Sequence, residues 1–410
     1  MADDGTTFDA SLTGQGGLGQ AHAGAMAAHR TALARVAYLG HDASDAAVRR
    51  RVRALLDDGL SVTGFMPYRR KPKDIFWPHT DLGETRDGDF LQRLRSIFPG
   101  ARVLSGADAF RGADVIIARN LDMLAMAFEA KRRARLSTPV IYECLDVHRL
   151  LTRTDAAGGL MRSLERALVA RTARVWVSSP GFLEHHFEPY HSGRYTAELM
   201  ENRLPASSEF GPRPELDAER TPGPFRLGWV GNLRCLRSFH LLLDLADRLG
   251  GEIEIHLHGV PARREIEVFE PEIDRRDNVH FHGRYQAPDD LADLYAPLDA
   301  VWAGDFMEAG ANSEWLLPNR LYEGGYFGVP PIAPTGTQTA NWIKGHGTGI
   351  LIDEPLDDSL PVLVAGLMSD PAPLQSARRR LLAQSEDVFV EPRGEMARLV
   401  QSVVDEMARR

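Results

Sequence analysis

The segment 317–333 contains the densest group of residues that could bind a ligand, and it reads LPNRLYEGGYFGVPPIA. Within it, Glu323 lies between the expected start of a helix and a Gly-Val-Pro turn that leads into an apolar strand. A carboxylate can accept hydrogen bonds from two vicinal hydroxyl groups at once. Arg320, one helical turn earlier, is a candidate for binding an anion. The alternative is that Glu323 is an exposed helix residue without a ligand.

A second group forms an expected anion-binding loop after an apolar run. The sequence WVGNLRCLRS places a glycine and two arginines just before a helix. Free backbone N–H groups at a helix N-terminus attract anions, and arginines add charge-assisted hydrogen bonds. We therefore expect a phosphate site here, the alternative being surface arginines on an ordinary loop. The candidate residues are Gly231, Asn232, Arg234 and Arg237.

A third group closes a predicted strand in the first half of the chain, where the sequence reads YECLDVH. His148 could hydrogen-bond a hydroxyl group or a phosphate, and Asp146 could take a proton or orient His148. The alternative is a solvated carboxylate and an imidazole that packs in the protein. Asp146 and His148 are the candidate catalytic residues of this segment.

Strands and helices alternate around all three groups. Short apolar runs that end in glycine or polar residues alternate with helical patterns, which predicts parallel sheets with helices on both faces. Ligands bind such sheets at the carboxyl ends of the strands. The predicted strands cover residues 35–40, 60–66, 101–105, 113–118, 138–143, 173–179, 225–231, 252–259, 278–283, 299–304, 329–333 and 348–352.

The length of 410 residues suits two domains rather than one. A segment rich in proline and charge, residues 206–224, is typical of an interdomain linker. We expect a disordered tail at residues 1–30, a first lobe at 31–205, a second lobe at 225–386 and a C-terminal helix at 387–410.

Composition excludes several classes of protein. The formal net charge of -9 and the sequence pI near 5.9 mean that the chain repels polyanions, so no nucleic-acid partner is expected. Two cysteines do not suggest a secreted disulfide scaffold, and neither a signal sequence nor a membrane-spanning stretch is recognisable. We expect a cytoplasmic protein. The basic clusters 69–73 and 131–135 suit anionic lipid headgroups at a membrane surface, or are solvated charge.

The segment 317–333 resembles the donor lobe of nucleotide-sugar glycosyltransferases of the GT-B fold, family 4 type. Its Pro-Asn-Arg-Leu-Tyr-Glu run is similar to that of bacterial exopolysaccharide glycosyltransferases of the succinoglycan-assembly kind. The resemblance implies an α/β protein with two doubly wound, Rossmann-like lobes that face a cleft. The first lobe would bind the acceptor, the second the donor, and the terminal helix would pack back on the first.

The same resemblance implies roles for individual residues. Glu323 matches the glutamate that accepts hydrogen bonds from the nucleotide ribose. The family's other glutamate falls on Trp315, so Glu314, one residue earlier, is the candidate catalytic residue beside the donor sugar. Further donor-binding candidates are Asn312 and Ser313 near the sugar, Asn319 beside Arg320, and Arg284 and Tyr285 at the base. The expected acceptor-side loop comprises Gly40, His41 and Asp42.

The resemblance implies a glycosyltransferase that moves a sugar from a nucleotide-sugar, with UDP expected, to a saccharide acceptor that is expected to be lipid-linked. Exopolysaccharide or cell-surface glycan synthesis is the expected process, with retention of anomeric configuration. One alternative is a non-catalytic protein that binds a nucleotide-sugar or a partner enzyme, which the missing first glutamate supports. The other is a nucleotide-sugar epimerase of the same fold.

No metal and no cofactor are expected, because enzymes of the GT-B fold generally work without a bound metal. His256, His258, His280 and His282 place paired imidazoles on single strand faces, a pattern that also occurs in zinc sites. Two strands that each run into a glycine explain these histidines more simply.

Overall fold

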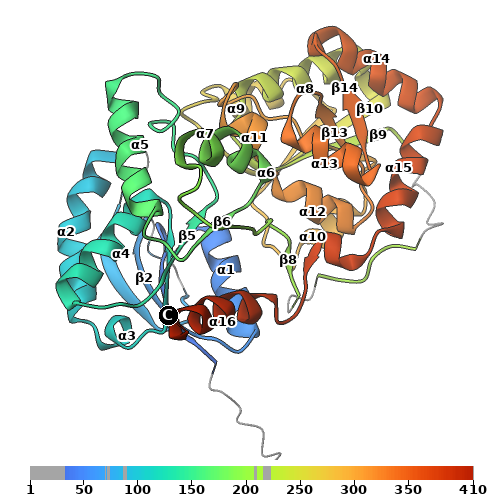
Figure 1. Cartoon of the computed structure of the whole chain (residues 1–410). Coiled ribbons are helices and arrows are strands. Elements are labelled where there is room, and N and C mark those ends of the chain that lie inside the picture. Colours follow the sequence, from blue (N-terminus) through green and yellow to red (C-terminus); the bar gives the residue numbers. More distant parts are fainter. Residues whose placement is uncertain are drawn as a thin grey trace, which may run out of the picture. The chain divides into compact units, whose positions relative to one another are not determined.

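Two parallel β-sheets with helices on both faces organise the chain (Figure 1). The computed structural model describes residues 33–69, 71, 74–85, 90–206, 210–215 and 223–409, so the predicted tail lies outside the described residues. From Leu33 onward the chain forms one compact unit. None of the described helices combines the length and apolar character needed to span a bilayer.

The first lobe contains a seven-stranded sheet in the order β3-β2-β1-β4-β5-β6-β7, with every pairing parallel. Its strands are β1 (Arg35–Leu39), β2 (Ser61–Tyr68), β3 (His79–Glu84), β4 (Val115–Arg119), β5 (Val140–Cys144), β6 (Arg174–Val177) and β7 (Ala197–Leu199). Its helices are α1 (Ala46–Asp57), α2 (Phe90–Gly106), α3 (Asp108–Arg111), α4 (Leu121–Ala134), α5 (Ala156–Val169), α6 (Pro180–Phe182), a π-helical turn (Leu183–Phe187) and α7 (Glu188–His191).

The second lobe contains a six-stranded sheet in the order β11-β10-β9-β12-β13-β14, also parallel throughout. Its strands are β9 (Phe225–Leu233), β10 (Ile253–Pro261), β11 (Val279–Gly283), β12 (Ala300–Trp302), β13 (Pro331–Pro334) and β14 (Ile350–Ile352). Its helices are α8 (Leu236–Leu249), α9 (Phe269–Ile273), α10 (Leu291–Tyr295), α11 (Asn312–Trp315), α12 (Asn319–Tyr326), α13 (Gln338–His346), α14 (Leu356–Ser369) and α15 (Ala372–Ala383), with 3-10 turns at Gly250–Glu252 and Glu386–Val388.

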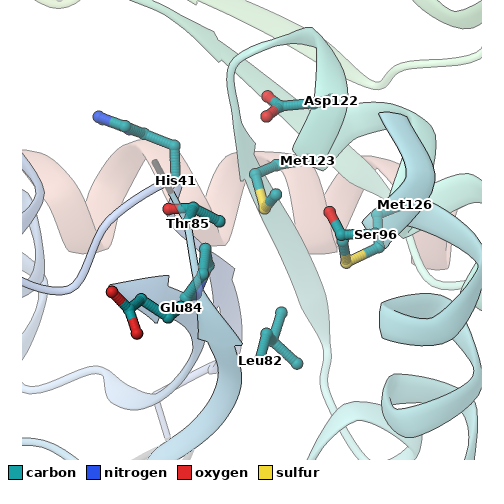
Figure 2. A pocket seen from close by; sticks show the side chains of 9 residues that line it. His41, Leu82, Glu84, Thr85, Ser96, Asp122, Met123 and Met126 are labelled. Carbon is teal, nitrogen blue, oxygen red and sulfur yellow. The ribbon is translucent and has the colours of Figure 1, made fainter. Parts of the chain in front are cut away.

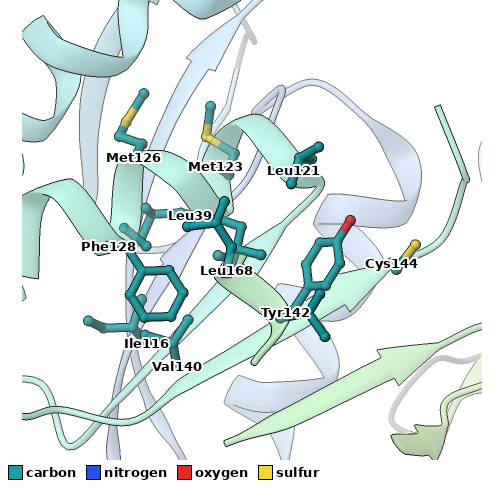
Figure 3. Close-up of a cluster of buried hydrophobic side chains, with 14 of the residues drawn as sticks. Leu39, Ile116, Leu121, Met123, Met126, Phe128, Val140, Tyr142, Cys144 and Leu168 are labelled. Carbon is teal, nitrogen blue, oxygen red and sulfur yellow. The ribbon is translucent and has the colours of Figure 1, made fainter. Parts of the chain in front are cut away.

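The core of the first lobe forms because its central strands are apolar on both faces, as parallel strands covered on both sides must be. On one face, Leu39, Ile116 and Val140 of the sheet pack with Met123 and Phe128 of α4 (Figure 3). Neighbouring strands thus supply one layer and α4 the next. This packing positions the loops that follow the carboxyl ends of the strands.

The C-terminal helix α16 (Glu395–Ala408) belongs to the core on the other face of the first sheet. Met396 and Val400 of α16 share a buried cluster with Tyr38 of β1 and Val52 of α1. The Asp58 carboxylate accepts hydrogen bonds from the Met396 and Gly394 backbone N–H groups at 2.8 and 2.7 Å, and so caps the start of this helix. The short strands β8 (Leu204–Pro205) and β15 (Val390–Glu391) pair just before it.

The strand predicted at 101–105 is wrong, because these residues lie in the second half of α2. Ile97, Ala101 and Leu104 recur at helical spacing and are buried in the same cluster as α4. The strand that actually flanks β2 is β3, whose sequence HTDLGE is too polar and too exposed to carry a strand signal.

The described part of the expected linker packs against the second lobe. The ring of Phe210 lies edge-on to that of Tyr326 with centroids 4.7 Å apart. The Arg213 guanidinium donates to the carbonyl oxygens of Leu381 and Gln384 at the end of α15, at 2.8 and 2.9 Å. These residues therefore hold one end of the connection on the second lobe.

Candidate active site

Each sheet contains a point at which the strand order reverses, between β1 and β4 in the first lobe and between β9 and β12 in the second. Ligands of parallel α/β sheets bind beside such points, at the carboxyl ends of the strands. Gly231 lies near the end of β9, and Asp146 is the second residue after β5. The predicted anion-binding loop and the predicted catalytic segment therefore both occupy the expected edge of a sheet.

Arg320 lies beside the predicted phosphate loop and is only 7% exposed. Its Nη1 donates to the carbonyl oxygen of Val230 at 3.2 Å, and a Cβ on Gly231 would lie 3.8 Å from the same nitrogen. Gly231 has φ +119°, which only glycine adopts readily. Burial lowers the pKa of Arg320, and the nearby Asp305 opposes that shift without cancelling it. Among the described residues, the Arg320 Nε has no hydrogen-bond partner.

Arg234 joins this group from the same loop. Its Nε and Nη2 both donate to the Asp305 carboxylate at 3.3 Å. Asn232 is exposed, and its carbonyl oxygen accepts from the Arg234 backbone N–H at 3.1 Å, which closes the turn. Arg237 points elsewhere: its guanidinium binds Glu354 at 2.8 Å and covers the ring of Phe306. Of the predicted arginines, the structure brings together Arg234 and Arg320 but not Arg237.

Glu323 is 1% exposed and makes contacts across the two lobes. Its Oε1 accepts from Nη2 of Arg50 on α1 at 2.8 Å, and its Oε2 accepts from the Tyr295 hydroxyl at 3.2 Å. Burial raises the pKa of the half-buried Tyr285, and the charge of Glu323 raises it further, so these two predicted donor-site residues are neighbours. Arg284 is exposed, and Asn319 begins α12 half-buried.

Asp146 reaches solvent at the end of the first sheet, yet protein encloses it closely enough that desolvation raises its pKa to about 6. Arg234 of the second lobe and Arg119 of the first oppose this rise, while Glu308 adds to it. Asp146 is therefore within electrostatic reach of the predicted phosphate loop. The Nδ1 atom of His148 accepts from the Leu150 backbone N–H at 3.2 Å, which leaves Nε2 to carry the proton of a neutral imidazole.

Asn312 ties the catalytic segment to the second lobe. Its Oδ1 accepts from the Val147 backbone N–H at 3.0 Å, and its Nδ2 donates to the Val147 carbonyl oxygen at 2.8 Å. Val147 lies between Asp146 and His148, so this amide positions both. The Ser313 hydroxyl donates to Asp305 at 2.9 Å. The side chains of these two residues, which we expected near the sugar, therefore brace the site.

Glu314 and Trp315 occupy the place of the family's first glutamate. The Glu314 carboxylate accepts from the Gly310 backbone N–H at 2.6 Å, within its own loop. Trp315 stacks on His185 of the first lobe with ring centroids 5.4 Å apart, and its carbonyl oxygen accepts from the Ser179 hydroxyl. Position 315 is thus a contact between the lobes, and the described contact of Glu314 is with backbone.

The acceptor-side loop borders a small cavity of about 60 Å³ at the edge of the first sheet (Figure 2). His41, after β1, lines it together with Asp122 and Met123 of α4. Burial lowers the pKa of His41, so its imidazole is neutral near pH 7. Asp42 is buried and accepts from the backbone and the hydroxyl of Ser44, which makes it a turn-forming residue. Gly40 leaves no free space for a Cβ, since Met66 would lie 2.9 Å away.

A separate network of charges lies beneath this loop. Glu143 is fully buried and accepts from the Tyr38 hydroxyl at 2.6 Å and from Arg51 Nε at 2.8 Å. Arg119 approaches it to 3.6 Å from the end of β4. Burial alone would raise the pKa of Glu143, but Arg119 and Arg51 outweigh it and the pKa is lowered. Arg51 also reaches Glu391 of β15 at 3.4 Å.

Comparison with known proteins gives a relative that covers most of the chain. No protein-family model matches. The succinoglycan biosynthesis protein ExoL of Rhizobium meliloti (strain 1021) is 36% identical over 343 residues, which are 82% of this chain and 85% of the relative. This chain belongs to the ExoL family. The expected resemblance to proteins of succinoglycan assembly is confirmed.

Solved structures confirm the GT-B fold of this ExoL-family chain. HepE of Anabaena, in complex with UDP-glucose, superposes with a TM-score of 0.64 at 14% identity, over 92% of this chain and 99% of that one. Sucrose-phosphate synthase from Thermosynechococcus elongatus gives a TM-score of 0.68 at 14% identity, over 91% and 99%. At such identities the likeness concerns the fold.

Several residues around the candidate site escaped the sequence analysis. Arg119 and Asp305 could have been found, because each follows a predicted strand where ligands bind. Arg50 carries no comparable signal, since it is one of three consecutive arginines on an amphipathic helix. Its pairing with Glu323 depends on how the two lobes meet.

Proposed function

We propose that this ExoL-family chain is a glycosyltransferase that moves a hexose from a nucleotide-sugar to a lipid-linked saccharide in exopolysaccharide or cell-surface glycan synthesis. Family membership and the fold support nucleotide-sugar transfer in polysaccharide synthesis. The observation that carries the proposal is the buried Arg320, whose Nε lacks a partner among the described residues, beside Gly231 and Arg234. A buried cation with free donors suits a diphosphate. UDP is the proposed nucleotide, because HepE was solved with UDP-glucose.

In the proposed reaction, the acceptor oxygen bonds to the anomeric carbon of the donor while the bond from that carbon to the phosphate oxygen breaks. The electron pair leaves with the diphosphate, whose charge Arg320 and Arg234 stabilise from fixed positions. The acceptor proton passes to the Asp146 carboxylate, whose pKa of about 6 keeps it ionised near neutrality. His148, with its proton on Nε2, would donate to a sugar hydroxyl. We propose retention of configuration on the family resemblance alone, with the acceptor oxygen approaching the same face of the anomeric carbon from which the diphosphate leaves.

Glu323 would bind the ribose of the donor, which requires a change at Arg50. Both carboxylate oxygens of Glu323 are engaged, one by Arg50 and one by Tyr295. A ribose hydroxyl would replace the Arg50 guanidinium on Oε1, while Tyr285 would lie at the base. The guanidinium groups of Arg234 and Arg320 would supply the positive charge that the diphosphate needs, so we propose that the transfer reaction itself uses no metal or cofactor.

A thermal-shift panel followed by a transfer assay tests the proposal. UDP, GDP, ADP and their sugars are compared on the native chain, on Arg320→Gln and on Arg248→Gln, an exposed arginine of α8 paired with Asp244. We expect UDP ligands to raise the melting temperature of the native chain and of Arg248→Gln by mass action, and to lose that effect in Arg320→Gln. Sugar transfer to lipid-linked saccharides should likewise be retained in the native chain and in Arg248→Gln and be lost in Arg320→Gln. No shift from any nucleotide with a folded sample would contradict the proposal.

A second candidate is a non-catalytic nucleotide-sugar-binding protein. Trp315 in place of the first glutamate, together with the contact of Glu314 to its own loop, favours it. The two candidates differ in turnover. Release of UDP that depends on an acceptor would establish the transferase, whereas a thermal shift without release from any lipid-linked or free saccharide would favour the binding protein.

We also propose that the first lobe contacts the membrane surface near the first basic cluster. Arg53 lies over the ring of Phe76 at 4.0 Å, and the exposed Lys71 belongs to the same region; residues 70, 72 and 73 lie outside the described residues. In the second cluster, Arg132 and Arg133 both pair with Glu129, which reduces their attraction for anions. Flotation with phosphatidylglycerol vesicles, but not with phosphatidylcholine vesicles, is the expected result.

A further inference from the structure

Four histidines lie on one face of the edge strand β11 and its neighbour β10, in a place that the transfer reaction does not use. Along β10, His256 and His258 alternate with Ile255 and Leu257, which are buried in the core on the opposite face. The pairing of β10 with β11 shifts between Leu257 and His258, so that His282 is an extra residue in the ladder. Such a bulge re-aims its side chain.

The bulge places the His282 ring between two others. The His256 Nδ1 and His282 Nε2 atoms are 3.0 Å apart, and the rings of His258 and His282 stack with centroids 4.2 Å apart. One ring nitrogen from each of these three residues lies within 4.8 Å of the other two. Nitrogen ligands around a tetrahedral Zn²⁺ are ~3.4 Å apart, given Zn–N bonds of about 2.1 Å. Small rotations of the side chains would therefore converge on one ion.

The remaining nitrogen of His256 is already oriented as in a metal centre. Its Nε2 lies 3.3 Å from the Glu254 carboxylate, which in turn accepts from Arg226 Nε at 3.1 Å. A histidine that binds a metal usually donates its other N–H to such a carboxylate, which sets the direction of the ligating nitrogen. Here that direction is toward His282.

The three imidazoles are also in the protonation state that binds cations. Burial lowers the pKa of His256, of His258 to about 4, and of His282, and the neighbouring imidazoles lower it further. For His256, Glu254 opposes this shift without cancelling it. All three are therefore neutral near pH 7. Ring nitrogens select ions such as Zn²⁺, Ni²⁺ or Cu²⁺ over Mg²⁺ and Ca²⁺, which prefer oxygen.

The other group with comparable spacing does not offer such a site. Glu165, His186 and His191 are fully buried, and the Nε2 atoms of both histidines lie 2.7 and 2.9 Å from the same Glu165 oxygen. Each of these Nε2 atoms already has the Glu165 carboxylate as its partner, and an ion there would have to displace both hydrogen bonds inside the core.

We infer that His256, His258 and His282 bind a transition-metal ion of the Zn²⁺ class on the second lobe, with Glu254 as the positioning carboxylate. The ion links the edge strand β11 to β10 immediately before Arg284 and Tyr285. It is structural, lies apart from the reacting atoms and does not depend on the proposed transfer reaction.

Calorimetry on the untagged full chain, stripped with EDTA and titrated with Zn²⁺ near pH 7.5, tests the inference. We expect one ion per chain, and the visible d–d absorption of a nitrogen-coordinated ion when Co²⁺ replaces Zn²⁺. The double variant His256→Ala/His282→Ala should lose both signals. Glu254→Gln should weaken the affinity about tenfold. His240→Ala, an exposed histidine of α8 outside the cluster, should bind as the native chain does.

Two outcomes would overturn the inference. One is the absence of Zn²⁺ heat and of the Co²⁺ band in the native chain. The other is binding that persists in the double variant, which would place the ion elsewhere. The single variant His282→Ala removes an exposed side chain, so it keeps the test valid if the double variant does not fold. Circular dichroism without metal establishes that each variant is folded.

Discussion

Buried arginines in the two lobes have opposite electrostatic surroundings. In the first lobe, Arg51 and Arg119 lie against Glu143, and their pKa values are raised because attraction outweighs burial. In the second lobe, Arg320 binds two backbone carbonyl oxygens, and its pKa is lowered because burial outweighs the pull of Asp305. Neighbouring acidic groups therefore compensate the positive charges of Arg51 and Arg119, whereas the charge of Arg320 is compensated incompletely.

This contrast distinguishes charged side chains that only stabilise the fold from a charged side chain that can bind a ligand. Glu143, Tyr38 and Arg51 satisfy one another, so that network needs nothing from outside. Arg320 keeps a buried Nε without a partner among the described residues, which costs stability unless a ligand supplies the acceptor. Removing charge should therefore have opposite consequences in the two places.

The largest expected effect is on stability in the first lobe. Glu143→Gln removes the buried carboxylate that Arg51 and Arg119 share, and breaking such a network lowers the free energy of unfolding by about 3–5 kcal/mol. Urea denaturation measures this change. Glu184→Gln, an exposed carboxylate on the π-helical turn, is the control and should change it by less than about 1 kcal/mol. Equal stability of the two variants would show that the Glu143 network stabilises the fold no more than an exposed carboxylate does.

The next effect is on catalysis in the second lobe. Arg320→Met removes a cation from the proposed diphosphate site, so kcat/KM for sugar transfer should fall about 10²- to 10³-fold. Because the lost charge is incompletely compensated, the melting temperature without ligand should stay the same or rise. Arg237→Met, whose guanidinium is exposed and bound to Glu354, should retain activity within about tenfold. A large loss of stability in Arg320→Met would show that its charge is structural too.

Arg50 combines a structural role with a role at the site. Its guanidinium neutralises the buried Glu323 carboxylate, but the proposed ribose would have to displace it from that carboxylate. Arg50→Ala should lower the free energy of unfolding by about 2 kcal/mol, since a buried carboxylate loses a charged hydrogen bond. The affinity for UDP, measured by calorimetry, should increase because the competitor for Oε1 is gone. Glu323→Ala should weaken UDP binding instead. Weaker UDP binding by Arg50→Ala would indicate that Arg50 itself contacts the donor.

The smallest expected effect is a pH dependence of activity that Asp146 sets. Charged residues of both lobes influence the pKa of this carboxyl group. Its pKa of about 6 means that the carboxylate accepts a proton above pH 6 and is itself protonated below it. The value of kcat/KM should therefore fall as the pH drops through about 6. In Asp146→Asn the remaining activity should lack this ionisation. An unchanged acid limb in the variant would assign the ionisation to another group.

Local patterns account for most of the fold and for part of the site. Buried strands and their helices were predictable because apolar runs and helical spacing show directly which faces avoid water. The placement of Asp146 and Gly231 at the carboxyl ends of strands, where such sheets bind ligands, was predictable from the apolar runs before them. The helix at 101–105 was missed because five residues of mixed character fit either element, and the helical spacing with Ile97 appears only across Pro99, which interrupts the pattern.

The amino-acid pattern indicated parallel α/β lobes, the order of most strands and helices, and the residue types at the ends of the strands, whereas the GT-B class was implied by the resemblance of segment 317–333. It did so because secondary structure and burial depend on neighbours a few positions away. The pairing of Arg50 with Glu323, the hold of Asn312 on Val147 and the bulge that brings His282 between His256 and His258 arise from the packing of distant segments. These contacts join residues up to 273 positions apart, over which no local pattern extends.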